Sequence, residues 1–411
     1  MAFVRLSDKA ANRTRLELAD IFANHANRFL SNYRVGFRHL KVLYAVVNCR
    51  TATLGGHRFK CASCDYQRYV YHSCRNRHCP KCQTRCKETW RKARSLELLP
   101  VPYFHQVFTL PHELNPWLLA SESNQRKLLE LLFKATADTL LEFGRGELGG
   151  QVGFTLILHT WDQQLRPHFH LHCLIASGSL SRTENRWRAG GNNFLFPVRA
   201  LSKMFRGKFV SGLNQLFDNG ELDEPRGVAQ LHVKQLLRSL SRKPWVVYSK
   251  APFAGPRKLL DYLSRYTHRV AISNDRLLRL QNGQVSFTYR DRKDGDRRKA
   301  LTLDASQFIG RFLSHVLPDG FTRIRHYGFM ANRHRRERLR QIRGLLGATA
   351  PVPASPAETL AQWLAATLGI EINNCPCCGS KLVKFELKPT APRRTIGPCL
   401  LSRGPPRVPT K

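Results

Sequence analysis

The sequence has few acidic residues for its length. Across 411 residues, 29 Asp and Glu face 67 Lys and Arg, which gives a formal net charge of +38. The excess of cations is spread along the chain and is not confined to one tail. A soluble protein with this charge is expected to work on a polyanion, and nucleic acid is the leading candidate.

The sequence also lacks long apolar runs. It has no stretch of eighteen or more apolar residues, so no membrane-spanning segment is expected. The first residues, Met-Ala-Phe-Val-Arg-Leu-Ser-Asp, contain no apolar segment of the kind found in secretory signals. These absences predict a cytoplasmic protein with no membrane partner. In that reducing compartment, cysteines grouped beside histidines favour metal binding over disulfides.

Two CxxC pairs lie close together in the first quarter of the chain. Cys61-Ala-Ser-Cys64 and Cys79-Pro-Lys-Cys82 are separated by fourteen residues. Each pair can supply two thiolates from one tight turn, and four thiolates make a tetrahedral structural zinc site. Cys74 and His78 are alternative ligands, and Cys86, His57 and His72 are also nearby. Further along, Cys375-Pro-Cys-Cys378 is one more half-site, for which the sequence shows no second pair.

A strand with three histidines lies near the middle of the chain, at Pro167-His-Phe-His-Leu-His-Cys-Leu-Ile175. Successive side chains on a strand point to opposite faces, so His168, His170 and His172 are expected to share one side. Phe169 and Leu171 then face a core. Imidazole is the commonest protein metal ligand, so the histidine side can hold a metal ion. The alternative is a histidine-rich strand edge without an ion.

Two tyrosines four residues apart lie on a predicted helix. On a helical wheel, Tyr262 falls toward Lys258, Arg265 and Arg269, whereas Tyr266 falls near the leucine stripe. Tyr262 is therefore expected to be the better exposed hydroxyl, in a cationic setting that suits phosphate. The alternative is a pair of half-buried core tyrosines.

An arginine-dense stretch runs from Arg323 to Arg343, with Tyr327 and Phe329 interleaved. Cations beside aromatic rings suit a single-stranded nucleic acid, because rings stack on bases while arginines track phosphates. The predicted DNA-binding residues are Arg265, Arg269, Arg323, Arg325, Arg333, Arg335 and Arg336.

The order of predicted elements favours an α+β fold with a largely antiparallel sheet. Strands are expected at 101–110, 154–159, 167–175 and 246–248, helices at 122–143 and 201–217, and a hairpin at 278–289. We predict a zinc-binding, DNA-binding domain at 1–100 and a catalytic domain at 101–345. Residues 346–411 are predicted to form a linker and a partly disordered tail.

The motifs resemble one known family. The segments SCRNRHCPKC, HTWDQQLRPHFHLHC, DYLSRYTHRVAISN and RIRHYGF, in this order, resemble the insertion sequence 91 family of rolling-circle transposases. The resemblance covers roughly Arg38 to Gly344. It implies an HUH endonuclease domain with a central antiparallel sheet behind a small zinc-binding domain. It also implies that His170 and His172 are the HUH pair, with His168 a further candidate ligand, and that Tyr262 and Tyr266 are the catalytic tyrosines.

The resemblance implies a metal-dependent transposase that nicks and transfers single-stranded DNA through a 5′-phosphotyrosine. The implied cofactors are structural Zn²⁺ and catalytic Mg²⁺ or Mn²⁺, although histidine ligands alone favour Mn²⁺, Zn²⁺ or another transition ion over Mg²⁺. The expected partners are transposon ends and target DNA, with a host replication helicase as a further candidate. Three alternatives remain open from the residues: a rolling-circle replication initiator, a non-catalytic zinc-dependent nucleic-acid-binding protein and a metal-dependent hydrolase.

Overall fold

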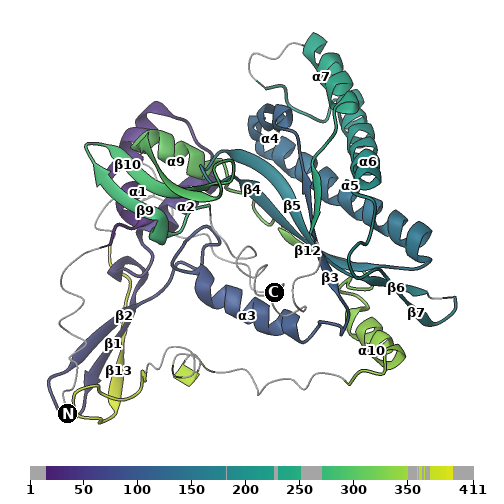
Figure 1. Ribbon diagram of the computed structural model, residues 1–411. Helices are drawn as coiled ribbons and strands as arrows, with labels where there is room; N and C mark the ends of the chain where they lie inside the picture. Colours follow the sequence, from purple (N-terminus) through teal and green to yellow (C-terminus); the bar gives the residue numbers. More distant parts are fainter. Residues whose placement is uncertain are drawn as a thin grey trace. The chain divides into compact units, whose positions relative to one another are not determined.

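The protein is described by a computed structural model (Figure 1). It describes residues 15–181, 183–225, 230–250, 271–349, 359, 361–362, 365 and 371–391. The chain divides into two compact units, which are treated separately. Unit 1 comprises Met1–Thr84, Val270–Val316 and Pro353–Lys411, and unit 2 comprises Arg85–Arg269 and Leu317–Val352. This division differs from the predicted one, because unit 1 takes residues from all three predicted segments.

One part of unit 1 packs helices against a three-stranded antiparallel sheet. Its elements are α1 (Leu18–Asn32), α2 (Phe37–Val47), β9 (Leu277–Gln281), β10 (Gln284–Asp291), β11 (Arg297–Asp304) and α9 (Ala305–Leu313). Apolar residues three or four apart on α1 are buried, and Phe22 meets Phe312 of α9 edge to face at 5.2 Å. Asn282 and Gly283 both have positive φ, as a tight two-residue hairpin turn requires. The predicted hairpin is confirmed.

The other part of unit 1 is a sheet built from both ends of the sequence. The strand order is β13 (Leu382–Leu387), β1 (Gly56–Cys61), β2 (Gln67–Tyr71), and both pairings are antiparallel. Residues 371–391, which lie in the segment predicted to be a linker and a partly disordered tail, therefore contain an ordered strand. Local composition does not reveal strand β13, because its partner β1 lies more than 300 positions away in the sequence.

Unit 2 is organised around a five-stranded sheet whose neighbouring strands are all antiparallel, which confirms the α+β prediction. The strand order is β12 (Ile324–Gly328), β4 (Gly153–Trp161), β5 (Pro167–Ala176), β3 (Tyr103–Thr109), β8 (Val247–Lys250). A two-stranded sheet of β6 (Gly178–Ser181) and β7 (Arg186–Ala189) follows β5 in the chain.

One face of this sheet packs on helices (Figure 1). Alternate strand residues such as Phe108, Leu158 and Leu171 join a core with α4 (Asn115–Ala120), α5 (Glu122–Leu148), α6 (Val198–Asp218) and α7 (Gln230–Arg242). At one end of the opposite face, Tyr103 and Leu174 pack with residues of α3 (Gln83–Ser95) and α10 (Arg335–Leu345). Within the described ranges, no helix combines the length and apolar character needed to cross a membrane.

Candidate functional site

Three histidines converge on the face of the sheet opposite the main core. His170 and His172 come from β5, and His159 comes from the neighbouring strand β4. Their ligand nitrogens all lie within 4.8 Å of one another. The three residues are only 8 %, 7 % and 4 % exposed, so the imidazoles form a compact, mostly buried group. Three imidazoles with this spacing can coordinate one divalent ion.

His159 is the member of this group that the sequence did not predict. It lies directly opposite His170 in the antiparallel register of β4 and β5, and directly opposed residues on one face are close neighbours. Its position at the end of an apolar strand was visible in the sequence. The register that brings it beside His170 was not.

His168 was predicted to share the histidine face, and the structure does not place it in the ligand group. The register between β4 and β5 shifts between the His159–His170 pair and the Trp161–Pro167 pair. His168 therefore lies where the two strands leave their regular register, near the start of β5. His168 is exposed, although its ring lies 4.7 Å from that of His170.

Hydrogen bonds orient two of the three imidazoles. Nδ1 of His170 lies 2.9 Å from the carbonyl oxygen of His168, and a carbonyl only accepts, so Nδ1 carries the proton. In the neutral imidazole Nε2 is then the unprotonated nitrogen, which is the form that coordinates metals. Nδ1 of His172 lies 2.8 Å from Nε2 of His105 on β3, with the two rings nearly parallel at 11°. Burial, with a smaller effect from Lys250, lowers the pKa of His105 to about 4. His105 is therefore neutral at pH 7.

Four cysteines form a separate cluster in unit 1. Cys49, which follows α2, joins Cys74, Cys79 and Cys82. The Sγ atoms of Cys49 and Cys82 are 3.6 Å apart, as are those of Cys74 and Cys82. Zn–S bonds of about 2.3 Å in a tetrahedron place sulfurs about 3.8 Å apart. The four thiols therefore fit one zinc ion.

The predicted grouping of Cys61 and Cys64 with Cys79 and Cys82 in one site is wrong. The β1–β2 hairpin separates the two pairs, because Cys61 lies at its turn and Cys74 follows the end of its return strand. Five or six strand residues at about 3.3 Å each span roughly 17 Å. Cys61 and Cys64 lie instead with Cys375 and Cys378. Of the two alternative ligands, Cys74 belongs to the first cluster, and His78 is not among the grouped residues.

Comparisons with known proteins identify the family. The family described as "Putative transposase" matches residues 153–338, and the family described as "Transposase zinc-binding domain", which carries the label of insertion sequence 91, matches residues 21–110. The chain is 42% identical to the putative transposase y4qJ of Sinorhizobium fredii, over 89% of the chain and 94% of that relative. It is 27% identical to the transposase for insertion sequence element IS801 of Pseudomonas savastanoi pv. phaseolicola, over 85% and 84% of the two chains. The chain belongs to the insertion sequence 91 family of transposases.

Solved structures give a weaker similarity. The conjugative relaxase TrwC in complex with OriT DNA matches 39% of the transposase and 71% of the relaxase chain, at 16% identity and a TM-score of 0.23. A metal-bound structure of the same relaxase gives a TM-score of 0.22 at 17% identity. At these scores the family assignment rests on the sequence matches alone.

The predicted catalytic tyrosines of the transposase, Tyr262 and Tyr266, lie outside the described residues, as do Arg265 and Arg269. Their roles stay predictions. Among the other arginines predicted to bind DNA, Arg333 and Arg336 are exposed and Arg323 is half-buried.

Two of the predicted DNA-binding arginines make contacts inside unit 2. Arg325 forms two hydrogen bonds with the carboxylate of Glu130, at 2.5 and 2.6 Å, and its guanidinium lies 4.1 Å from the ring centre of Phe133. The hydrogen bonds to Arg325 lower the pKa of Glu130. Arg335 pairs with Glu97 at 3.0 Å. These contacts give both arginines a role in holding the fold, so neither is a freely available phosphate ligand.

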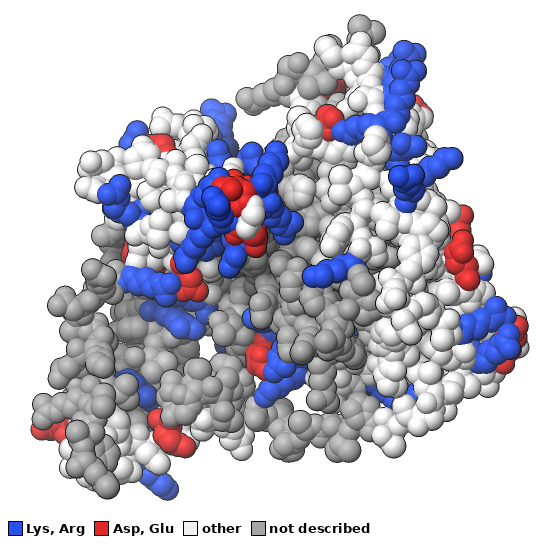
Figure 2. Space-filling view, in the orientation of Figure 1, with Lys and Arg blue, Asp and Glu red and all other residues white. Residues whose placement is uncertain are grey.

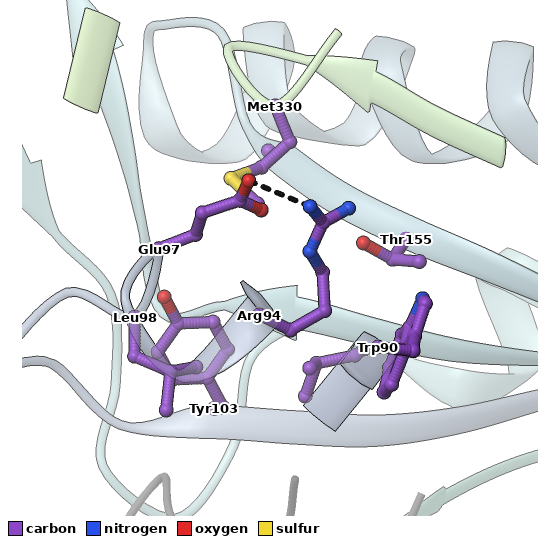
Figure 3. Close-up of a pocket in the computed structure, with 9 residues that line it drawn as sticks. Trp90, Arg94, Glu97, Leu98, Tyr103, Thr155 and Met330 are labelled. Atoms are coloured by element: carbon purple, nitrogen blue, oxygen red, sulfur yellow. Dashed lines mark ion pairs between the residues drawn. The ribbon is translucent and has the colours of Figure 1, made fainter. Parts of the chain in front are cut away.

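A small pocket lies farther along the histidine face of the sheet (Figure 3). Arg94 reaches into it and pairs with Glu97 at 2.9 Å. Nη1 of Arg94 also lies 3.1 Å from Nε2 of His326, whose Nδ1 lies 2.8 Å from the hydroxyl of Thr155. Burial first, and then Arg94 and Arg335, lower the pKa of His326 to about 3. This network joins α3 and α10 to the sheet and is a structural element of the transposase.

Proposed function

We propose that this transposase nicks and transfers single-stranded DNA at the ends of its element through a 5′-phosphotyrosine intermediate. The observation that carries the proposal is the compact group of His159, His170 and His172 in a member of this transposase family. Three buried imidazoles, two of them oriented by outer hydrogen bonds, resemble a prepared metal site more than a histidine-rich strand edge.

Each part of the proposed site has a chemical task. A divalent ion, Mg²⁺ or Mn²⁺, held by the three histidines would polarise the scissile phosphate. The tyrosine hydroxyl, whose unperturbed pKa is about 10, is a weak nucleophile and needs a cationic setting to stabilise the phenolate. We assign the first attack to Tyr262 and the cationic setting to Arg265 and Arg269. Attack forms a bond from the tyrosine oxygen to phosphorus and releases a free 3′-hydroxyl, so the strand can later be rejoined without ATP.

Family membership favours this function over the alternatives. A rolling-circle replication initiator would use the same nicking chemistry, but the relatives reported above are named as transposases. A non-catalytic zinc-dependent DNA-binding protein would have no need for an oriented histidine triad. The proposed helicase partner and the cytoplasmic location stay predictions.

The proposal predicts a metal-dependent covalent adduct. Purified protein incubated with an end-labelled single-stranded oligonucleotide that carries an element end should yield a slower-migrating band on a denaturing gel. The band should appear with Mn²⁺ or Mg²⁺ and disappear with EDTA, because the phosphate is then not polarised. Binding measured by anisotropy in EDTA separates loss of chemistry from loss of affinity. An adduct that forms equally well in EDTA would contradict the metal-dependent mechanism.

A further inference from the structure

Four thiols from opposite ends of the sequence converge in unit 1. The Sγ atoms of Cys61 and Cys378 are 3.4 Å apart, those of Cys64 and Cys375 are 3.6 Å apart, and those of Cys64 and Cys378 are 3.7 Å apart. All four lie within 4.8 Å of one another. Disulfide sulfurs are about 2.0 Å apart, whereas the sulfurs of a tetrahedral zinc site are about 3.8 Å apart. The geometry is that of a zinc site.

Both loops that carry these cysteines have the same local geometry. The backbone N–H of Ser63 donates to Sγ of Cys61 at 3.4 Å, and that of Cys377 donates to Sγ of Cys375 at 3.4 Å. In each loop the donor lies two residues after the acceptor, so both thiolates are stabilised by a tight turn. Gly379 follows with a φ of +76°, a conformation that favours glycine. Cys377 lies in the same turn as Cys375 and Cys378 but is exposed and outside the group.

The backbone beside this cluster joins the same two segments. Strand β13 pairs with β1 over six consecutive residues, and the guanidinium of Arg68 on β2 donates to the carbonyl of Ile372 at 3.0 Å. The C-terminal segment thus supplies both the third strand of this sheet and half of the cysteine cluster.

We propose that Cys61, Cys64, Cys375 and Cys378 bind a second zinc ion, which links the C-terminal segment to the β1–β2 hairpin. The matched zinc-binding domain ends at residue 110, so it does not include the C-terminal half of this site. Most large side chains of the three strands are at least partly exposed, and so small a sheet has little core of its own. Metal coordination supplies folding free energy where a core does not.

Zinc content tests this directly. Native mass spectrometry of the unmodified full-length protein should show two zinc ions per chain. Cys378→Ala should keep one, as should Cys79→Ala in the first cluster, and the double variant should keep none. Cys377→Ala is the matched control, because it lies in the same turn outside the cluster, and it should keep both ions. One zinc ion in the unmodified protein, or two in Cys378→Ala, would overturn the proposal.

Limited proteolysis gives a second readout that does not depend on DNA. Loss of the second zinc ion in Cys378→Ala should make residues 56–71 sensitive to protease, although they lie about 300 positions away in the sequence. Cys377→Ala should leave the protease resistance of residues 56–71 unchanged. Unchanged resistance of residues 56–71 in a Cys378→Ala protein that has lost one zinc ion would contradict the proposal that this ion links the two segments.

A different observation concerns one face of this three-stranded sheet. The strand register places Tyr69, Arg58 and Phe385 in a row across β2, β1 and β13. Tyr69 is 52% exposed and Phe385 is 41% exposed, and the guanidinium of Arg58 lies 5.0 Å from the ring centre of Phe385. Tyr71 lies beside Tyr69, with ring centres 6.5 Å apart and planes at 26°. The face therefore presents three aromatic rings around one cation.

The charge of this face suits a polyanion. Lys60 adds a second, exposed cation on the same side, and none of the residues that β1, β2 and β13 place on this side is acidic. Exposed aromatic residues on a sheet bind single-stranded nucleic acid by stacking on successive bases, while neighbouring cations contact the phosphates. Duplex DNA keeps its bases stacked on one another and does not offer them to such a face.

We infer that this face, defined by Arg58, Lys60, Tyr69, Tyr71 and Phe385, binds the bases of single-stranded DNA. The inference rests on the proposed function, since it supplies a binding surface for the strand that is cut. It also gives the C-terminal segment a direct part in DNA binding through Phe385.

Anisotropy with a labelled single-stranded oligonucleotide tests this inference in buffer without added Mg²⁺ or Mn²⁺ and without chelator, so that the strand is not cut and bound zinc is retained. Tyr69→Ala and Phe385→Ala should each weaken binding by about 5-fold to 100-fold, because each removes one stacking partner. The slope of affinity against salt should not change, whereas Arg58→Ala should reduce that slope. Tyr69→Leu repeats the test with an apolar side chain that cannot stack. Val70→Ala, which alters an exposed residue on the opposite face, is the control.

Affinities of Tyr69→Ala, Tyr69→Leu and Phe385→Ala within twofold of the unmodified protein would overturn the inference. An equal loss in Val70→Ala would also count against it. Failure of the proposed function gives a different result. The unmodified protein would then form no covalent adduct even at saturating DNA, while the variants would still weaken DNA binding as expected.

Discussion

Replacing His159 with alanine is expected to lower adduct formation on single-stranded DNA by about 100-fold or more. His159 is one of three imidazoles within coordinating distance of one another, and it lies opposite His170 across the β4–β5 pair. A metal ion contributes several kcal/mol of transition-state stabilisation, and each 1.4 kcal/mol is a factor of ten in rate. Loss of one of three ligands should remove much of that contribution. His170→Ala and His172→Ala are expected to have similar effects.

His168→Ala is the matched control for this prediction. His168 lies on the same strand, its ring is close to His170, and it is exposed and outside the ligand group. Adduct formation should stay within about threefold of the unmodified protein, because the carbonyl that orients His170 belongs to the backbone and remains. A loss of activity in His168→Ala as large as that in His159→Ala would contradict the proposal that His159, His170 and His172 hold the metal. Activity of His159→Ala equal to that of the unmodified protein would contradict it as well.

The second large effect is expected at the tyrosines. Tyr262→Phe keeps the ring but removes the hydroxyl, so it should bind DNA normally and form little first-step adduct. A reduction of at least 100-fold is expected, because the proposed mechanism assigns the first attack to the Tyr262 hydroxyl and reserves Tyr266 for the second exchange. The measurement is the adduct band on a denaturing gel with a single-stranded element end.

Tyr266→Phe separates the roles of the two tyrosines. It should still nick DNA and form the adduct, but it should fail to complete strand transfer to a second oligonucleotide. The order would be refuted by adduct levels in Tyr262→Phe equal to those of the unmodified protein. If instead the two single variants each lost half of the adduct, the tyrosines would be interchangeable.

The sequence predicted the histidine strand because its signal is local. Alternation places His170 and His172 on one side and Leu171 on the other, and the structure confirms this arrangement. His159 and His105 could not be found in the same way. Their places in the site depend on the register of β4 and β3 against β5, which is set by tertiary packing.

The cysteines show the same limit more clearly. The CxxC spacing marked Cys61, Cys64, Cys79 and Cys82 as members of cysteine clusters, and the structure places each of them in one, but the spacing could not show which pairs meet. Cys49 has no partner cysteine close to it in sequence, and it is brought to its cluster by the end of α2. Cys375 and Cys378 meet their partners through strand pairing between distant segments.

The density of arginines between Arg323 and Arg343 did not show which of these side chains are available to bind DNA. Arg325 and Arg335 lie in the arginine-rich stretch, but each is paired with a carboxylate from another element of unit 2. The partners, Glu130 on α5 and Glu97, precede them by about 200 residues, so composition could not separate these arginines from exposed ones such as Arg333.

Peptide mapping of the covalent adduct identifies the nucleophilic residue of the transposase. The unmodified protein is incubated with a single-stranded element end and Mn²⁺, digested with nuclease and protease, and analysed by tandem mass spectrometry. We expect a nucleotide attached through a 5′-phosphate to Tyr262, with the mass shift absent in Tyr262→Phe and in EDTA. Attachment to a residue other than Tyr262 or Tyr266, or a cleaved strand with no protein attached, would contradict it.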